Sequence, residues 1–331
     1  MRAVMCRALG EPEDLVVEDL DTVPCGLDQV RVRIWSSGVN YVDALFVQGR
    51  YQIKPPLPFV PGSEIAGEIT EVGPAVDGWT VGDRVMASTG LGGFADEAVL
   101  RPDQLTRIPD NLSFGQAATM GQSYCTAWFT LTRRTVLRPE DWVVLFGAAG
   151  GVGLAMLDVA RSFGAHTVAV ASSPEKLQLV IERNANAVID ASVPESEAGP
   201  LRNQIREITG GGADIVVDTV GGSLAEAGLR GLREGGRLMV IGFASGDIPS
   251  LPANQVLLRN RSVLGVDWGA WALGHPQENA ALLREVLAQV EAGALSPIEP
   301  TTLPLEDVGV ALRDLLERRV VGKVALESRA R

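Results

Sequence analysis

The chain has 331 residues, of which 46% are hydrophobic and 21% are charged, and it carries a net charge of −12. This length indicates two domains, and the hydrophobic content excludes a disordered chain. The negative charge argues against a nucleic-acid or anionic-membrane partner, because both would require a basic face.

Residues 1 to about 115 are predicted to form short strands and turns. β-Branched, alternating residues indicate strands at 30–38, 63–73 and 83–88, and a proline-punctuated loop is expected at 55–62. The close spacing of these strands predicts a compact β-rich barrel or sandwich.

From about residue 140 the pattern changes to strands that alternate with helices. Near-continuous apolar strands in such an alternation predict a parallel sheet that is covered on both faces. Beyond this region the sequence predicts one more short strand, two helices and a last strand near Val324. The expected strands are 142–146, 167–171, 187–190, 213–221, 236–242 and 262–266, and the expected helices are 151–163, 174–183, 277–291 and 305–318.

A glycine-rich segment, VVLFGAAGGVGLAMLDVA at 143–160, lies between a predicted strand and a predicted helix. Glycines in such a loop permit a tight turn, a close approach to a pyrophosphate, and close packing of helix on strand. The N–H groups and the dipole of the helix start favour the same phosphates. The alternative is a turn that serves packing only. The expected cofactor contacts are Gly147, Ala148, Ala149, Gly150, Gly151, Val152 and Gly153.

The end of the second strand indicates which dinucleotide would bind. No Asp or Glu occurs between Val159 and Pro174 to hold the ribose 2′-hydroxyl of NAD. In its place are Ser172, Ser173 and Lys176, whose hydroxyls and ammonium group suit the 2′-phosphate of NADPH. The alternative is that the serines only cap the next helix and that the lysine is solvated, and Glu175 weakens the NADPH interpretation.

Few residues could hold a metal. The sequence has two histidines, His166 and His275, and three scattered cysteines without a CxxC pair. A catalytic zinc usually needs a cluster of such ligands, so no metal site is expected. The cysteines are expected to be free thiols in a reducing cytoplasm, and residues 1–10 lack a signal peptide's apolar run.

Eight segments together resemble the medium-chain dehydrogenase/reductase superfamily, in its zinc-independent quinone oxidoreductase branch. Zinc-dependent relatives carry Cys where Asn40 stands and His where Ser63 stands. The segments follow the family's order over nearly the whole chain. They are SSGVNYVDALFVQGRY (36–51), PGSEIAGEI (61–69), VGDRV (81–85), YCTAWFTL (124–131), GAAGGVG (147–153), VVDTVGG (216–222), GGRLMVIGFASG (235–246) and GKV (322–324).

The resemblance implies an α/β fold with a Rossmann doubly wound parallel sheet and a GroES-like β-barrel catalytic domain. The catalytic domain would comprise residues 1–118 and 266–331, and residues 119–265 would form the NADPH-binding domain. The cleft between the domains is expected to hold the reaction. The resemblance also implies a homodimer.

Several residues acquire expected roles from the same resemblance. Asn40 is expected to contact the nicotinamide or its ribose, and Asp43 to take part in catalysis or only to brace its loop. Tyr51 could donate a hydrogen bond to the acceptor oxygen, and Tyr124 could be an acid or a stacking group. Further cofactor contacts are expected from Thr126, Val220, Gly242, Phe243, Ala244, Val266, Asp267, Trp268 and Lys323, with a packing role equally open for Trp268.

The expected function is metal-independent hydride transfer from NADPH to a quinone. A second hypothesis is an NADPH-dependent reductase of enoyl thioesters or enones, which are α,β-unsaturated carbonyl compounds. A third is a dinucleotide-binding structural or interaction protein with little turnover. Binding without oxidation of NADPH by any acceptor would distinguish this third hypothesis from the other two.

Overall fold

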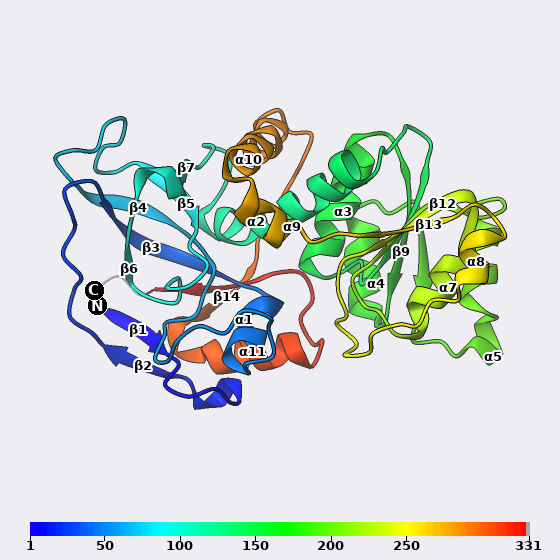
Figure 1. Cartoon of the computed structure of the whole chain (residues 1–331), viewed down its shortest axis with the longest axis horizontal. Coiled ribbons are helices and arrows are strands. Elements are labelled where there is room, and N and C mark those ends of the chain that lie inside the picture. The colour runs from blue at the N-terminus through cyan, green and yellow to red at the C-terminus, as the bar shows by residue number, and fades with distance from the viewer. Residues whose placement is uncertain (329–331) are drawn as a thin grey trace. The chain divides into compact units, whose positions relative to one another are not determined.

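The computed structural model describes residues 1–328. The chain forms two compact units (Figure 1). Unit 1 is Met1–Gly121 together with the chain from Pro297 onward, and unit 2 is Gln122–Ser296. The expected domain boundary at 265/266 differs from this grouping, because residues 266–296 pack on other parts of unit 2. For example, Glu285 accepts hydrogen bonds from Trp128 and Arg133, and the Ser296 N–H donates to Asp158.

Unit 1 is built on a seven-stranded, mainly antiparallel sheet with the order β14-β15-β3-β4-β5-β7, in which β6 also pairs with β3. A separate antiparallel pair is formed by β1 and β2. Alternate residues of β3 point into the core, as the strand pattern predicts. The strands are β1 (Arg2–Met5), β2 (Val16–Asp19), β3 (Val30–Val39), β4 (Glu64–Val72), β5 (Arg84–Ser88), β6 (Glu97–Leu100), β7 (Leu105–Arg107), β14 (Thr301–Pro304) and β15 (Val324–Glu327).

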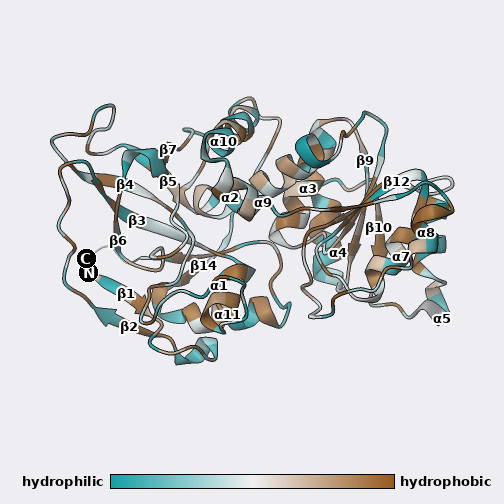
Figure 2. Cartoon of the chain, viewed as in Figure 1, coloured by the Kyte–Doolittle hydropathy of each residue, from teal (hydrophilic) through white to brown (hydrophobic). Residues whose placement is uncertain are grey.

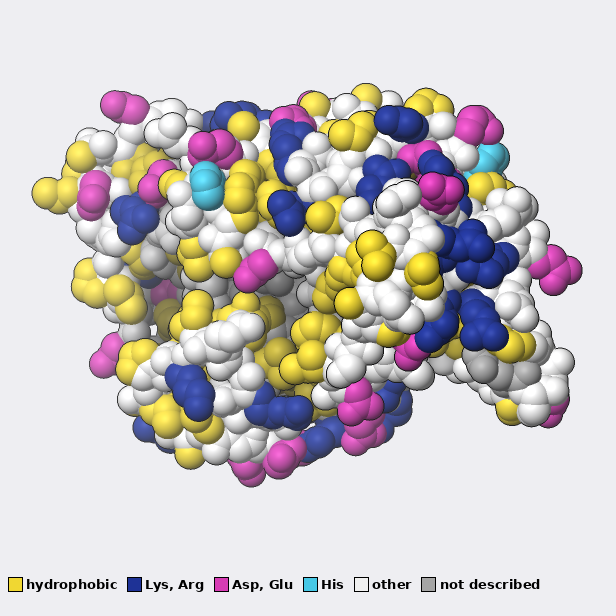
Figure 3. Space-filling view, turned by 45° about the vertical axis from the view of Figure 1, so that its right-hand side comes forward, with side chains coloured by type: hydrophobic (Ala, Val, Ile, Leu, Met, Phe, Trp, Pro, Cys, Tyr) yellow, Lys and Arg dark blue, Asp and Glu magenta, His cyan; other side chains and the backbone are white. Residues whose placement is uncertain are grey.

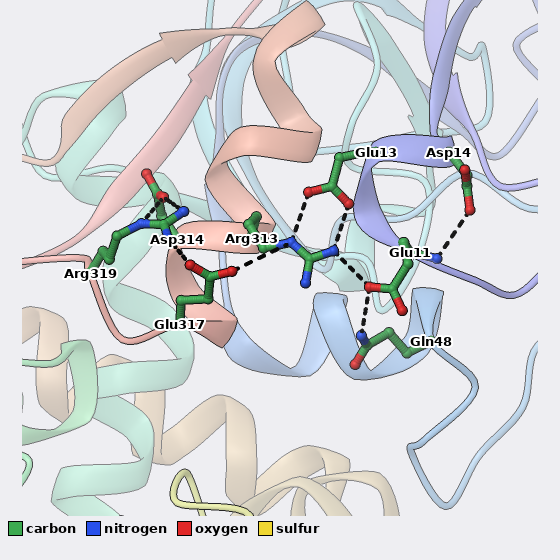
Figure 4. A network of polar contacts seen from close by, with 8 residues as sticks. All are labelled: Glu11, Glu13, Asp14, Gln48, Arg313, Asp314, Glu317 and Arg319. Carbon is green, nitrogen blue, oxygen red and sulfur yellow. Dashed lines mark hydrogen bonds and ion pairs between the residues drawn. The ribbon is translucent and has the colours of Figure 1, made fainter.

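Two helices of unit 1 pack together beside this sheet: α1 (Tyr41–Val47) and α11 (Val308–Leu316). Ala44 and Val47 of α1 share one buried cluster with Leu312 of α11. At the surface, the Arg313 guanidinium of α11 bonds the carboxylates of Glu11 and Glu13 at 2.6–2.7 Å (Figure 4). This ion pair lowers the pKa of Glu13 to about 2. These contacts hold α1, whose first turn carries part of the candidate site.

The other helical elements of unit 1 are short, except for α2 (Phe114–Phe129), which crosses the boundary between the units in the sequence. Three are 3₁₀ turns: η1 (Pro12–Asp14), η2 (Pro102–Gln104) and η4 (Leu305–Asp307). The expected helix at 305–318 is therefore a 3₁₀ turn followed by α11.

Unit 2 contains a six-stranded parallel sheet with the order β10-β9-β8-β11-β12-β13. Val144, Phe146 and Val216 share a buried cluster with residues of α6 and α7. The intervening Val143 and Leu145 are also fully buried, so both faces are covered, and the strands are hydrophobic in Figure 2. The strands are β8 (Trp142–Phe146), β9 (His166–Ala171), β10 (Ala187–Asp190), β11 (Ala213–Asp218), β12 (Leu232–Val240) and β13 (Ser262–Gly265).

The order of the strands reverses between β8 and β11, and such a switch point is where open parallel sheets bind ligands. The glycine-rich loop directly follows β8 and therefore lies at this point. The helical elements of unit 2 are the π-helical turn η3 (Thr130–Arg134), α3 (Gly151–Ser162), α4 (Pro174–Glu182), α5 (Glu195–Ala198), α6 (Leu201–Ile208), α7 (Ser223–Gly231), α8 (Ala253–Leu257), α9 (Trp268–Gly274) and α10 (Pro276–Glu291).

Basic side chains gather on one part of the face drawn in Figure 3. One arginine cluster of unit 2 lies at the amino ends of β12 and β13, opposite the glycine-rich loop. The guanidinium groups of Arg206 and Arg261 both donate to the carbonyl of Arg230, at the carboxyl end of α7. Burial and neighbouring arginines lower the pKa of both groups. The cluster therefore stabilises the carboxyl end of α7, where the helix dipole places partial negative charge.

Candidate active site

The glycine-rich loop lies between β8 and α3, as the sequence predicts. Gly147 follows β8 with a φ of 69°, which residues with a side chain rarely adopt. A Cβ added to Gly153 would lie 2.3 Å from the Gly147 carbonyl oxygen and 2.6 Å from Ala148 Cα, so only glycine allows this packing. Gly150 is exposed, and a Cβ there would meet only the Gly147 carbonyl oxygen, at 3.4 Å. The fold therefore requires Gly147 and Gly153, whereas it tolerates a larger residue at 150.

The start of α3 is suited to bind a phosphate. Its first N–H groups, from Gly151 to Gly153, have no acceptor within the helix and lie at the positive end of the helix dipole. Gly150, the N-cap residue that precedes the helix, has no side chain to accept a hydrogen bond from these N–H groups. These features fit the pyrophosphate of a dinucleotide.

The residues expected at the 2′-phosphate follow β9. Ser173 is the N-cap of α4, and its hydroxyl oxygen accepts the Lys176 N–H at 3.4 Å. The neighbouring Glu175 carboxylate accepts hydrogen bonds from its own backbone N–H and from Ser173, and these bonds lower the pKa of Glu175. Ser172 is exposed and Lys176 is half-buried, and both lie close after the carboxyl end of β9.

Two loops at the carboxyl ends of β11 and β12 are joined to each other. Asp218, the last residue of β11, accepts hydrogen bonds from the N–H groups of Val220 and Gly221 at 2.8 Å. The Ala244 N–H donates to the Thr219 carbonyl. Burial raises the pKa of Asp218. The expected cofactor residues Val220, Gly242, Phe243 and Ala244 are thus brought together, and Asp218, which the sequence reasoning did not single out, holds the first loop.

A cavity of about 500 Å³ in unit 2 borders the same strand ends. Its walls include Phe243, Val266 and Asp267, which were expected to contact the cofactor, and Phe129 and Arg134, which were not. Trp271 also lines it. Phe129 and Trp271 are in ring contact with centroids 4.7 Å apart. The cavity is largely apolar with one cation, Arg134, and one carboxylate, Asp267, at its wall.

Three other expected residues of unit 2 have partners within that unit. The Asp267 carboxylate caps α9 through the Ala270 N–H, and Trp268 donates its indole N–H to Asn279 on α10. The carbonyl of Thr126, a buried residue of α2, accepts a hydrogen bond from the Thr130 hydroxyl. Direct contact of these three residues with a cofactor stays a prediction.

In unit 1, Asn40 lies in a buried polar cluster with Glu64 and Lys323. Lys323 Nζ donates to Asn40 Oδ1 at 2.9 Å, and Asn40 Nδ2 donates to Glu64 Oε2 at 2.8 Å. Asp43 adjoins the cluster, because its Oδ2 accepts the Asn40 N–H at 2.8 Å. Burial lowers the pKa of Lys323. Glu64 was missed by the sequence reasoning, although it lies inside the segment PGSEIAGEI that carries the resemblance.

Asp43 and Tyr51, two other expected site residues of unit 1, differ in burial and in their contacts. Asp43 is completely buried and closes the first turn of α1, which favours the bracing role over the catalytic one. Burial raises the pKa of Asp43 to about 7. Tyr51 is half-buried, and its ring contacts Phe46 with centroids 4.8 Å apart.

Tyr124, expected as an acid or a stacking group, lies in the interior of unit 2. It is 5% exposed, and its hydroxyl donates to Asp158 Oδ2 at 2.8 Å. Burial and the Asp158 charge raise the pKa of Tyr124 well above its ordinary value. Asp158 also accepts the Ser296 N–H at 2.6 Å. This arrangement argues against proton donation by Tyr124 and gives its hydroxyl a structural role.

Tyr124→Phe is therefore expected to lower the free energy of unfolding by about 1–3 kcal/mol, because one donor to a buried carboxylate is lost. The turnover of the folded variant should stay within about threefold of the wild type. Urea denaturation and steady-state kinetics measure the two quantities. A loss of turnover of about 100-fold without a loss of stability would instead restore Tyr124 as the general acid.

Two other properties of the described residues bear on the function. No group of three His, Cys, Asp or Glu side chains within residues 1–328 is placed to hold a metal ion, and Cys6, Cys25 and Cys125 form no disulfide bond. In the same residues, no helix has the length and apolar composition needed to cross a membrane. Metal independence of the reaction stays a prediction.

Two family profiles match the chain in the order expected from the resemblance. Residues 26–110 match the alcohol dehydrogenase GroES-like domain, and residues 151–288 match the zinc-binding dehydrogenase family. These matches and the parallel sheet of unit 2 confirm the predicted fold class of a Rossmann sheet with a GroES-like domain.

Individual relatives and solved structures are similar to this chain over nearly its whole length. A quinone oxidoreductase-like protein 2 homolog from Nematostella vectensis is 40% identical over 99% of this chain and 89% of its own length. A solved structure described as an NAD-dependent alcohol dehydrogenase is 33% identical and superposes with a TM-score of 0.90 over 99% of this chain and 100% of that one. A mycobacterial protein complexed with NADPH is 28% identical, with a TM-score of 0.88 and the same coverage. The chain belongs to the medium-chain dehydrogenase/reductase superfamily, and within it to the zinc-independent quinone oxidoreductase branch.

Proposed function

We propose that the chain is an NADPH-dependent quinone reductase that transfers hydride without a metal. The observation that carries this proposal is the glycine-rich loop at the switch point of the sheet, together with a second strand, β9, that is followed by Ser172, Ser173 and Lys176 and has no Asp or Glu before Pro174. The relatives support it, since one curated relative is named a quinone oxidoreductase-like protein and one solved relative holds NADPH.

The residues of unit 2 would bind and orient the dinucleotide. The N–H groups of Gly151, Val152 and Gly153 would donate to the pyrophosphate, and Ser172 with Lys176 would hold the 2′-phosphate. Hydrogen bonding between the loops after β11 and β12 would fix the backbone of 242–244 beside the nicotinamide. When bound, NADPH supplies the hydride, and the protein supplies orientation, which contributes about 7–11 kcal/mol in well-oriented systems.

In unit 1, Asn40 would contact the nicotinamide or its ribose, and Tyr51 would donate a hydrogen bond to the acceptor oxygen, which gains negative charge. One hydride and one proton convert a quinone into a hydroquinone, and water can provide the proton. Reduction of an enone requires protonation at carbon, for which a placed acid is more important. The bond from the Tyr124 hydroxyl to Asp158 removes one candidate acid, which supports the quinone as acceptor over an enone or an enoyl thioester.

The proposal is tested by the oxidation of NADPH with matched panels of quinones, enones and enoyl thioesters. We expect kcat/KM to be highest for a quinone. A higher value for an enone or an enoyl thioester would select the second hypothesis. Binding of NADPH without turnover of any acceptor would select the binding-protein hypothesis. We also propose, on the resemblance alone, that the chain forms a homodimer in the cytoplasm.

Lys176→Ala tests the choice of dinucleotide. The variant is expected to raise the Kd for NADPH by roughly 10–100-fold, because a charge-assisted contact of about 1.5–3 kcal/mol is lost. The Kd for NADH should change by less than about threefold. Fluorescence titration measures both values, and Lys54→Ala, at an exposed lysine of unit 1, is the matched control. An equal change for the two dinucleotides would show that Lys176 does not hold the 2′-phosphate.

A further inference from the structure

The orientation of the Asn40 amide is set by two opposite charges. An ammonium group can only donate hydrogen bonds, so the Asn40 atom that faces Lys323 at 2.9 Å must be the oxygen. An ionised carboxylate can only accept, so the atom that faces Glu64 at 2.8 Å must be the nitrogen. A flipped amide would place its NH₂ group against the ammonium and its oxygen against the carboxylate. Lys323 and Glu64 together therefore exclude the flipped orientation of the Asn40 amide.

The cluster of Asn40, Glu64 and Lys323 is also shielded from solvent. Glu64 is 3% exposed, Lys323 is 8% exposed and Asn40 is 9% exposed, so little water competes for these bonds. Each Asn40 amide atom retains a second hydrogen-bonding position, because the NH₂ group has two protons and the carbonyl oxygen has two lone pairs. Asn40 can thus bind a ligand while Lys323 and Glu64 hold it.

The charge at position 323 has a second effect. Asp43 and Glu64 are two buried carboxyl groups close to one another, and Glu64 raises the pKa of Asp43 while Lys323 lowers it. Without the ammonium, ionisation of both carboxyl groups would leave two buried charges uncompensated, which is strongly unfavourable. Lysine is rare in this chain, with three lysines among 29 basic residues, and one of them is at this position.

We propose that Lys323 is a positioning residue that, together with Glu64, fixes the orientation of the Asn40 amide and thereby sets the rate of hydride transfer. This role differs from the direct cofactor contact expected from the sequence, and it rests on the proposed function. Lys323 acts through Asn40, so removing either residue should have the same consequence for the reaction.

A double-mutant cycle of Asn40→Ala and Lys323→Met tests this. Each single variant is expected to lower kcat by about 100-fold, as misplaced contacts do, and the double variant should lower it no further. The Kd for NADPH in Lys323→Met should stay within about threefold of the value in Asn40→Ala. Lys323→Arg, which keeps the charge, should recover at least tenfold of the loss. Independent, multiplying effects of the two substitutions would overturn the proposal, as would a much weaker affinity for NADPH in Lys323→Met than in Asn40→Ala.

The variant Glu64→Gln/Lys323→Met covers the case in which Lys323→Met does not fold, because it removes both charges. Its kcat should be as low as that of Asn40→Ala, and a wild-type kcat would overturn the proposal. A crystal structure of this double variant without ligand provides a readout that does not depend on turnover. The Asn40 side chain should take another orientation or rotamer, and an unchanged side chain would contradict the proposal. This second readout decides the positioning role even if the wild type reduces no quinone.

Discussion

Gly153→Ala is expected to weaken NADPH binding by more than about 100-fold and to lower the free energy of unfolding by about 1–3 kcal/mol. The reason is steric, since the new Cβ would lie 2.3 Å from the Gly147 carbonyl oxygen and 2.7 Å from the Ala148 carbonyl carbon. Both are backbone atoms, so the loop itself must move away from α3. The N–H groups at the start of that helix would then no longer converge on one phosphate.

Gly150→Ala is the matched control, because it adds the same methyl group three residues earlier. Its Cβ would meet only the Gly147 carbonyl oxygen at 3.4 Å, and the backbone φ of −83° suits alanine. The melting temperature should therefore stay within about 2 °C of the wild type. If the exposed face of Gly150 is where the pyrophosphate approaches, the Kd for NADPH should still rise about tenfold or more. Unchanged affinity in both variants would exclude this loop as the dinucleotide site.

The strands of unit 2 are largely predictable from the sequence. Predicted strands at 142–146 and 187–190 coincide with β8 and β10, because short apolar runs bounded by turn residues carry the signal locally. The strand expected at 213–221 ends earlier, at Asp218, where the side chain bonds the next N–H groups and turns the backbone. The hydrogen bonds of the Asp218 side chain therefore end the strand, although the strand-like pattern continues beyond this residue in the sequence.

The helices were harder to predict where packing outweighs pattern. The sequence does not predict α2, because its polar residues are all uncharged and the helix is mostly buried, so the helical period gives only a weak signal. It also does not predict α7, which contains Gly228 and Gly231, two residues of low helix propensity. In both helices the tertiary contacts stabilise a structure that local preferences do not indicate.

The residues of the candidate site also differ in how far the sequence predicts their roles. The glycine loop and the cap at Ser173 are local, so spacing is enough to predict them. The bond from Lys323 to Asn40 joins residues 283 positions apart, and the bond from Tyr124 to Asp158 spans 34 positions. Nothing in the local sequence of Tyr124 distinguishes a tyrosine that faces a ligand from one that holds a buried carboxylate. Such assignments need the fold.

Asp43 is expected to make the stability of the protein fall as the pH rises from about 4 to about 7. Burial raises the pKa of Asp43 from 3.8 to about 7, and Glu64 adds to the rise, while the Asn40 N–H, Ser63 and Lys323 oppose it. In this range the folded protein keeps the Asp43 proton and the unfolded chain releases it. Stability is therefore highest below the unfolded pKa and is lost through the folded pKa, by about 4 kcal/mol in all.

Asp43→Asn removes this titration and preserves an acceptor for the Asn40 N–H. The variant and the wild type should have similar free energies of unfolding near pH 4, below which both states keep the Asp43 proton, and the variant should be the more stable one at pH 8. Urea denaturation across this range measures the difference, and Asp77→Asn, at an exposed position, controls for the change in net charge. If Asp43→Asn is equally destabilised at both pH values, Asp43 is ionised throughout, and its carboxylate serves as a permanent counter-charge for Lys323.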